Sequence, residues 1–188
     1  MHGFLQAEHH NPLAGVVHVD DGYLGGKRQG IRGRGAHGKT PFITALSLVN
    51  GRPAQLKLSI VPNFTRSSIG NWAQTALSGP CTVYSDSLSG FAGLKSNEIT
   101  HKPVNISANP TAKDQLFQAI NTIMGNLKRY LLGIHHAIRV DNLARYLAAF
   151  AWRFNHRYDL KQAFHDGLNC IKATQPLTLK NLRHVLCT

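Results

Sequence analysis

A hairpin signature in the first third of the chain limits the folds that are open to it. Residues 42–49 are rich in apolar and β-branched side chains, which favours a strand. Asn50-Gly51 follows, the strongest two-residue signal for a tight hairpin turn, and apolar and polar residues then alternate over 56–60. The sequence therefore predicts two antiparallel strands joined by a two-residue turn.

Two further strand-like segments lead into aspartates. Residues 16–19 (VVHV) precede Asp20 and Asp21, and residues 82–85 (TVYS) precede Asp86. β-Branched and aromatic side chains favour strands, and the polar residues that follow are typical of strand ends. We expect each strand to stop at these acids.

Helices are predicted between and after these strands. A short one is expected over 67–77 and is expected to stop at the Gly-Pro of residues 79–80. A longer one begins with Asn109 as its cap and Pro110 in its first turn, and runs to Gly133. Its apolar positions recur at helical spacing and are Phe117, Ile120, Met124, Leu127 and Leu131.

The remaining chain is also predicted to be helical. A helix is expected over 141–155, and the last thirty residues are expected to form helix with short loops. The 188 residues give room for one ordinary domain, and their hydrophobic content of 43% is enough for a core. Strands and helices together predict an α/β domain.

The charge of the chain points to a polyanionic partner. It carries 21 Lys and Arg against 9 Asp and Glu, a formal net charge of +12. Nucleic acid is the first candidate and an anionic membrane surface the second, while the alternative is a solvated surface that serves solubility. No acid occurs between residues 22 and 85, where the basic residues are Lys27, Arg28, Arg32, Arg34, Lys39, Arg52, Lys57 and Arg66.

Several classes of protein are disfavoured. No apolar stretch approaches the roughly 18 residues of a membrane span, and the first residues lack the basic and apolar regions of a signal peptide. The cysteines (Cys81, Cys170 and Cys187) are odd in number and far apart, which disfavours a disulfide framework or a zinc ribbon within these residues. A reducing cytoplasm is therefore expected.

Residues 33–40 match the phosphate-binding loop pattern GxxxxGK[ST]. That loop works only between a strand and a helix, because the helix N-terminus faces the phosphates. Pro41 and a strand follow here instead, so a nucleotide triphosphatase is disfavoured.

The few acids indicate a metal site. Asp20 and Asp86, at the ends of adjacent strands, can converge on one divalent ion. Mg²⁺ is a candidate, because it prefers oxygen ligands such as carboxylates. On the long helix, Asn121 and Lys128 are seven residues apart and share one stripe, so Asn121 can offer a carbonyl oxygen and Lys128 can hold a phosphate. Ordinary turn aspartates and a solvated asparagine remain alternatives, and Asp114, on the same stripe, is an alternative third ligand.

At these residues the chain resembles the catalytic domain of bacterial insertion-sequence transposases. Residues 17–27 (VHVDDGYLGGK) resemble the first-aspartate motif of that family, and residues 84–86 (YSD) resemble the second. Residues 121–129 (NTIMGNLKR) resemble the third motif, in the subgroup where asparagine replaces the glutamate of the Asp-Asp-Glu triad. Residues 145–157 resemble the block that closes the domain, and the resemblance runs over about 16–160.

The resemblance implies an RNase H-like fold, a mixed five-stranded α/β sheet flanked by helices with a C-terminal helical segment. We expect an N-terminal tail over 1–15, the catalytic core over 16–137 and a helical segment over 138–188 that completes the domain. His136 matches a histidine that recurs in the family, and no role is assigned to it.

The resemblance also implies cleavage of DNA at the ends of the element and strand transfer into target DNA, with Mg²⁺ or Mn²⁺. Asp20, Asp86 and Asn121 would be the catalytic metal ligands, and water and then a 3′-hydroxyl the nucleophiles. Lys128 and Arg129 would bind DNA, together with Lys27, Arg28, Arg32, Arg34 and Lys39. A homo-oligomer on DNA, in the nucleoid of a bacterial cytoplasm, is expected from the family.

The chain departs from the family pattern in two ways. Members generally carry a cysteine-rich zinc ribbon before the catalytic domain, whereas Met1 lies nineteen residues before Asp20, so we expect a truncated copy. Asparagine also removes one negative charge, which predicts weaker metal binding than with glutamate. The alternatives are an inactive basic DNA-binding remnant and a metal-dependent nuclease of the same fold.

Overall fold

A five-stranded mixed sheet forms the centre of the molecule, in a computed structural model that describes residues 2–25, 39–95, 98–104, 110–135 and 138–174. Across the sheet the strand order is β3-β2-β1-β4-β5. β2 is antiparallel to both β1 and β3, while β4 is parallel to β1 and β5 is parallel to β4. The strands are β1 (Leu13–Leu24), β2 (Thr40–Val49), β3 (Arg52–Ile60), β4 (Leu77–Asp86) and β5 (Ile99–Val104).

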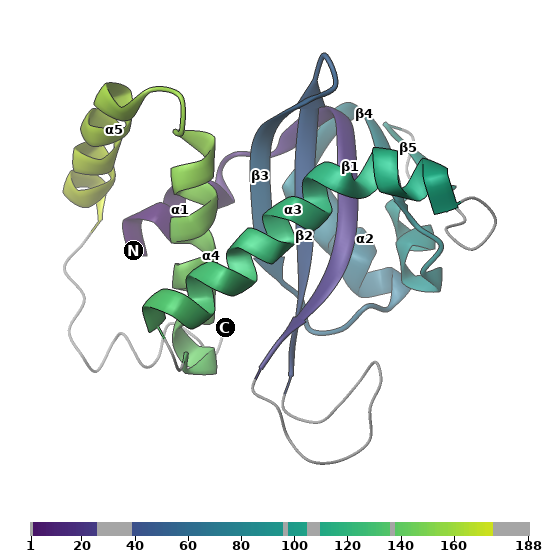
Figure 1. Ribbon diagram of the computed structural model, residues 1–188, viewed down its shortest axis with the longest axis horizontal. Coiled ribbons are helices and arrows are strands. Elements are labelled where there is room, and N and C mark those ends of the chain that lie inside the picture. The colour runs from purple at the N-terminus through teal and green to yellow at the C-terminus, as the bar shows by residue number, and fades with distance from the viewer. Residues whose placement is uncertain (1, 26–38, 96–97, 105–109, 136–137, 175–188) are drawn as a thin grey trace.

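Helices cover both faces of this sheet and one of its edges. The helix α3 (Pro110–His135) lies across one face, and α2 (Arg66–Ala76) lies behind the other (Figure 1). Beyond β3, three helices gather: α1 (His2–His9), α4 (Val140–Asn155) and α5 (Leu160–Ala173). This mixed sheet with flanking and C-terminal helices is the predicted RNase H-like α/β fold.

The predicted hairpin is confirmed. Asn50 and Gly51 both have positive φ values, 51° and 73°, and connect β2 to β3 with Val49 opposite Arg52. A two-residue turn with both residues in this region has the twist that antiparallel strands require. The dipeptide therefore sets the register between β2 and β3 where they leave the turn.

The prediction that the first strand stops at its aspartates was wrong. β1 continues through Asp20 and Asp21 to Leu24, because Asp20 pairs with Thr44 of β2 and Asp21 with Ile43. Strand propensity is easily overridden by pairing with neighbours. Only Asp86 ends its strand as expected.

The predicted short helix is present, but it does not stop at the Gly-Pro dipeptide. α2 is capped by the side chain of Thr65 and passes at Leu77 straight into β4, which contains Gly79 and Pro80. Proline is tolerated there because the pairing of β4 with β1 jumps from Leu77 to Cys81, across a register shift. The missing proline N–H therefore costs no hydrogen bond to β1.

The apolar face predicted for α3 is confirmed, since all five of its positions are buried. The predicted cap Asn109 lies outside the described residues. α4 buries Leu143 and Leu147 as expected, and α5 forms within the predicted C-terminal helical region. The helix α1 was not predicted, and Phe4 stacks it on Trp152 of α4 with ring centres 4.4 Å apart.

The core has two layers. On the α2 side, Val17, Val19 and Val83 of the central strands pack against α2 and the short 3₁₀ helix η1 (Ser89–Leu94). On the other side, Phe42 and Leu46 of β2 pack against α3 and α4. Alternate residues of each strand thus supply the two layers.

The outer edge of β3 is bonded to the end of α4. The side-chain amide of Asn155 accepts a hydrogen bond from the Leu56 N–H at 2.7 Å and donates one to the Leu56 carbonyl at 3.0 Å. Arg157 donates to the carbonyls of Ala54, at 3.1 Å, and Pro53. The closing sequence block therefore occupies backbone groups that an edge strand otherwise offers to another chain.

Candidate active site

The two predicted aspartates lie next to each other on the sheet. Val19 of β1 pairs with Ser85 of β4, so the following residues, Asp20 and Asp86, occupy neighbouring positions. Both lie on the α3 side, because side chains alternate along a strand and His18, two residues before Asp20, contacts Phe117 of α3. Both are half-buried. The pairing of β1 with β4 brings together two carboxylates that are far apart in the sequence.

Backbone hydrogen bonds orient both carboxylates. Asp20 Oδ1 accepts from the N–H of Asp21 at 3.0 Å, and Asp86 Oδ1 accepts from the N–H of Leu88 at 3.1 Å. The second contact is a local turn closed by an aspartate, which is why β4 ends there. A carboxylate held in this way keeps its direction relative to the sheet.

The helix α3 lies close to the sheet beside Asp20. Thr44, the β2 partner of Asp20, donates through its hydroxyl to Met124 Sδ at 2.9 Å. Gly22 permits this approach, since a Cβ there would lie 2.5 Å from the Phe42 ring and 2.8 Å from Met124 Cε. The short distance between α3 and β1 thus depends on a glycine two residues after Asp20.

Asn121 and Lys128 share one edge of α3, opposite to the edge of Ile123. Asn121 follows Phe117 by four residues and precedes Met124 by three, so it is next to both on the helix surface. Ile123, on the opposite edge, packs with residues of β2, β3 and α4. Lys128, seven residues after Asn121, shares its edge, and both side chains are exposed. Asn121 is thus one helical turn from Met124, which contacts Thr44, the β2 partner of Asp20.

A buried histidine lies beside this site and was not predicted. His18 is 3% exposed, and its ring lies 5.6 Å from that of Tyr84 and 5.7 Å from that of Phe117. Burial lowers the pKa of His18, opposed by a hydrogen bond with the backbone of Leu116. A neutral ring is therefore favoured next to the carboxylates. Its position within an apolar strand motif was the signal that could have revealed it.

The predicted DNA-binding residues are only partly described. Lys39 is exposed just before β2, and Arg129 is exposed on α3, where it bonds Asn126 Oδ1 at 2.9 Å. Four others, Lys27, Arg28, Arg32 and Arg34, lie outside the described residues, as do His136 and the side chain of Asp114.

The phosphate-loop pattern is not followed by the helix that such a loop needs. Its last residue, Thr40, is already the first residue of β2. Residues 33–38 lie outside the described residues. The structure around Thr40 agrees with the interpretation against a nucleotide triphosphatase.

The donor set at the aspartates has two carboxylates and one amide. In the described part of the chain, no three His, Cys, Asp or Glu side chains form a group that could hold a metal ion. Asp20, Asp86 and Asn121 are oxygen donors, the type that Mg²⁺ prefers, and two carboxylates with water and substrate are enough for this ion. The residues present therefore fit a divalent cation of this kind.

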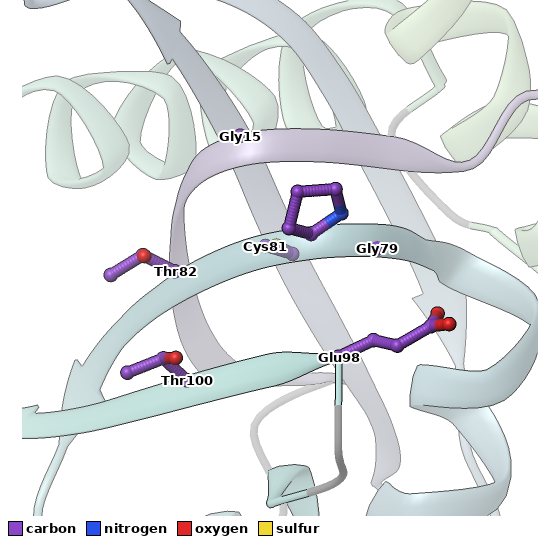
Figure 2. A pocket seen from close by; sticks show the side chains of 7 residues that line it. Gly15, Gly79, Cys81, Thr82, Glu98 and Thr100 are labelled. Atoms are coloured by element: carbon purple, nitrogen blue, oxygen red, sulfur yellow. The ribbon is translucent and has the colours of Figure 1, made fainter.

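Two cavities lie elsewhere. One, of about 530 Å³, is lined by residues of β1, β4 and β5 including Gly15, Thr82 and Glu98 (Figure 2). The other, of about 790 Å³, lies between β3, α2, α4 and α1. Neither contains Asp20 or Asp86. The aspartates thus lie outside both of these cavities.

Comparison with known proteins gives one family. The family model described as "ISXO2-like transposase domain" matches residues 12–155, which include both aspartates and Asn121. No curated protein and no solved structure matches the chain. Among the residues that the structure describes, none of the helices has both the length and the apolar character needed to cross a membrane.

Proposed function

Because the chain belongs to the family of ISXO2-like transposase domains, we propose that it catalyses metal-dependent cleavage and strand transfer of insertion-sequence DNA. The observation that carries this proposal is the adjacency of Asp20 and Asp86 on the sheet face over which α3 holds Asn121. Two carboxylates from separate strands and an amide from a helix form a compact set of oxygen donors. DNA is the substrate that the family implies and that the charge of +12 favours.

The three residues have distinct roles in this proposal. Asp20 and Asp86 hold Mg²⁺ or Mn²⁺ through carboxylate oxygens, and Asn121 contributes its neutral side-chain oxygen. When bound, paired divalent ions supply charge stabilisation for the attacking and leaving oxygens of a phosphoryl transfer. Asn121 is neutral, so the site carries one negative charge fewer than it would with glutamate at this position. The phosphate is therefore less strongly repelled, and the metal is less tightly bound.

The rest of the chain positions the DNA. Lys128 holds a backbone phosphate on the α3 side, and Arg129 and Lys39 add to the attraction. The neutral ring of His18 adds no positive charge beneath the carboxylates, so they keep their attraction for the metal. Water attacks a phosphorus at the end of the element and breaks its P–O3′ bond, which frees a 3′-hydroxyl; this hydroxyl then attacks a phosphorus of the target DNA and displaces a 3′-hydroxyl of the target. No covalent intermediate with a side chain is required.

Metal binding can be tested without activity. Mn²⁺ should raise the melting temperature of the wild-type chain by linkage, and the Asp20→Asn/Asp86→Asn variant should lose this rise. Asp141→Asn is the matched control, because Asp141 is exposed and paired with Arg139 on α4. Equal stabilisation of all three proteins would mean adventitious binding by some of the eleven histidines and would refute the site.

The reaction is tested with DNA that carries the ends of the element. Nicking that requires Mn²⁺ and both aspartates, followed by joining to a second duplex, supports transposition. Nicking without joining would instead identify a nuclease of the same fold. Binding with neither step would identify a DNA-binding remnant. Size-exclusion chromatography of the complex tests whether the chain assembles as a homo-oligomer on paired ends, as we also propose.

A further inference from the structure

The sheet face that carries the aspartates extends beyond them toward β5. On the β2 and β3 side this face is covered, because α3 and α4 pack there. On the other side, Thr100 and Lys102 of β5 are exposed, and Thr82 of β4 lies beside Thr100 (Figure 2). At the end of β5, Val104, the partner of Asp86, packs against the cluster that contains Phe117 of α3, so the exposed positions of this strand on this face are the preceding ones, Thr100 and Lys102.

A single row of side chains crosses this part of the face. His18 of β1 pairs with Tyr84 of β4, and Tyr84 pairs with Lys102 of β5. The rings of His18 and Tyr84 are 5.6 Å apart, and the Lys102 ammonium lies 5.6 Å from the centre of the Tyr84 ring. The contacts show that all three side chains are on the same face. Two residues further along β4 is Asp86, roughly 7 Å away along the strand.

Two exposed lysines, Lys128 and Lys102, belong to elements of this face. Lys128 lies on one edge of α3, and Lys102 lies on β5, the outermost strand of the sheet next to β4. A single lysine can attract DNA but cannot fix the direction in which a strand crosses the site. Two lysines on different elements define a path across the sheet.

We propose that Lys102 binds a backbone phosphate of the DNA on the β5 side of the aspartates, and that the Tyr84 ring positions its ammonium group. The proposal rests on the proposed function, since it takes DNA as the substrate of this face. The DNA strand then runs from β5, across the ends of β4 and β1, to Lys128 on α3. Tyr84 restricts the ammonium to this face through a cation–π contact, so less side-chain freedom is lost when the phosphate binds.

The test measures binding of a duplex oligonucleotide in EDTA, which separates it from metal binding and catalysis. Each phosphate contact contributes about 0.9 to the slope of log affinity against log salt. Between 50 and 200 mM salt, the affinity of the wild type should therefore fall about 3.5-fold more than that of Lys102→Ala. Lys102→Arg should retain the wild-type slope.

Lys161→Ala is the matched control. Lys161 is exposed on α5, away from the sheet, and its removal changes the net charge by the same amount. It should keep the wild-type slope. A slope for Lys102→Ala equal to that of the wild type or of Lys161→Ala would overturn the proposal, and so would absence of binding by the wild type at 50 mM salt.

The positioning role of Tyr84 has its own readout. Tyr84→Phe keeps the ring and should bind DNA as the wild type does, whereas Tyr84→Leu should weaken binding at low salt while retaining the wild-type slope, because the lysine is still present. Equal affinities for Tyr84→Leu and Tyr84→Phe would overturn this role. If Mn²⁺ fails to stabilise the wild type while Lys102→Ala changes the slope, the proposed catalysis fails and the phosphate contact remains.

Discussion

The two faces of the sheet are built from the same strands and serve different ends. On the α2 face, Val17, Val19 and Val83 are completely buried among apolar neighbours. The residues that directly follow these valines, His18, Asp20 and Tyr84, lie on the α3 face. Because side chains alternate along a strand, the four residues 17–20 supply both a dry core and a polar site.

Neighbouring positions of one strand can therefore differ in role, one contributing to the stability of the fold and the next to the candidate site. The α2 face tolerates no polar group without cost, while the α3 face holds carboxylates that a core would exclude. Substitutions on the first face should therefore act on folding, and substitutions on the second should act on DNA or metal.

The largest effect is expected on the α2 face. Phe91 of η1 is 0% exposed, so Phe91→Ala should lower the free energy of unfolding by about 3–5 kcal/mol through lost burial and a residual cavity. Urea unfolding measures this change. Leu132→Ala, at an exposed position of α3, is the control and should change it by about 0.5 kcal/mol or less. Similar losses for both would contradict the comparison of the two faces.

The edge of β3 provides the next effect. Asn155→Ala removes the two hydrogen bonds to the backbone of Leu56 and the hydrogen bonds to the Glu8 carboxylate, and leaves the N–H and carbonyl of Leu56 without this partner, which should cost about 2–3 kcal/mol. Asn126→Ala is the control, because Asn126 is exposed and bonds only another exposed side chain in the described residues. A loss below that of the control would mean that water replaces the amide of Asn155 at no cost.

A glycine pair on the α3 face gives effects of opposite sign. Gly22→Ala places a methyl group against Phe42 and Met124 and should cost about 1–3 kcal/mol. Gly125 lies on α3, and a Cβ there would have no neighbour within 4 Å. Gly125→Ala should therefore raise the free energy of unfolding by about 0.5–1 kcal/mol. Thermal unfolding of both variants distinguishes them. Because Gly22 sets the approach of α3, its variant should also lose Mn²⁺ stabilisation, while Gly125→Ala should retain it.

The smallest effect is a pH dependence. Burial lowers the pKa of His18 in the folded state, so between the unfolded value of 6.5 and more acidic pH the unfolded chain binds more protons. The contribution of His18 to the free energy of unfolding is therefore complete above pH 6.5 and decreases as the pH falls. At pH 5 the decrease is at most about 2 kcal/mol. His18→Gln should show a smaller decrease than the wild type in urea unfolding between pH 7 and pH 5. Equal decreases would assign the pH dependence to other groups, such as His101, whose pKa burial also lowers.

The parts of the fold that local signals determine could be predicted. The Asn50-Gly51 turn needs positive φ values that few residues adopt, and the apolar spacing of α3 leaves one face to bury. Pairing between distant segments could not be predicted in this way. The extension of β1 past its aspartates and the short strand β5, which contains Pro103 and has three exposed and three partly buried residues, depend on neighbouring strands.

The same distinction holds for the site. Two strand signals locate Asp20 and Asp86, and the spacing of seven places Asn121 and Lys128 on one edge of α3. That the two aspartates are neighbours follows from the pairing of β1 with β4. His18 and Lys102 were missed, because the contacts of His18 and the position of Lys102 come from the register of β1, β4 and β5, which single segments do not encode. Their placement required the structure.

The parallel pairing of β1 with β4 has a consequence for folding. The first three strands form an antiparallel meander of mostly local contacts, whereas β4 reaches β1 only after the chain has crossed the sheet through α2. Loop closure over such separations makes parallel pairing a slow event. The meeting of Asp20 and Asp86 depends on this pairing, since the two residues come from β1 and β4. A chain without it keeps its charge of +12 and does not bring the two carboxylates together.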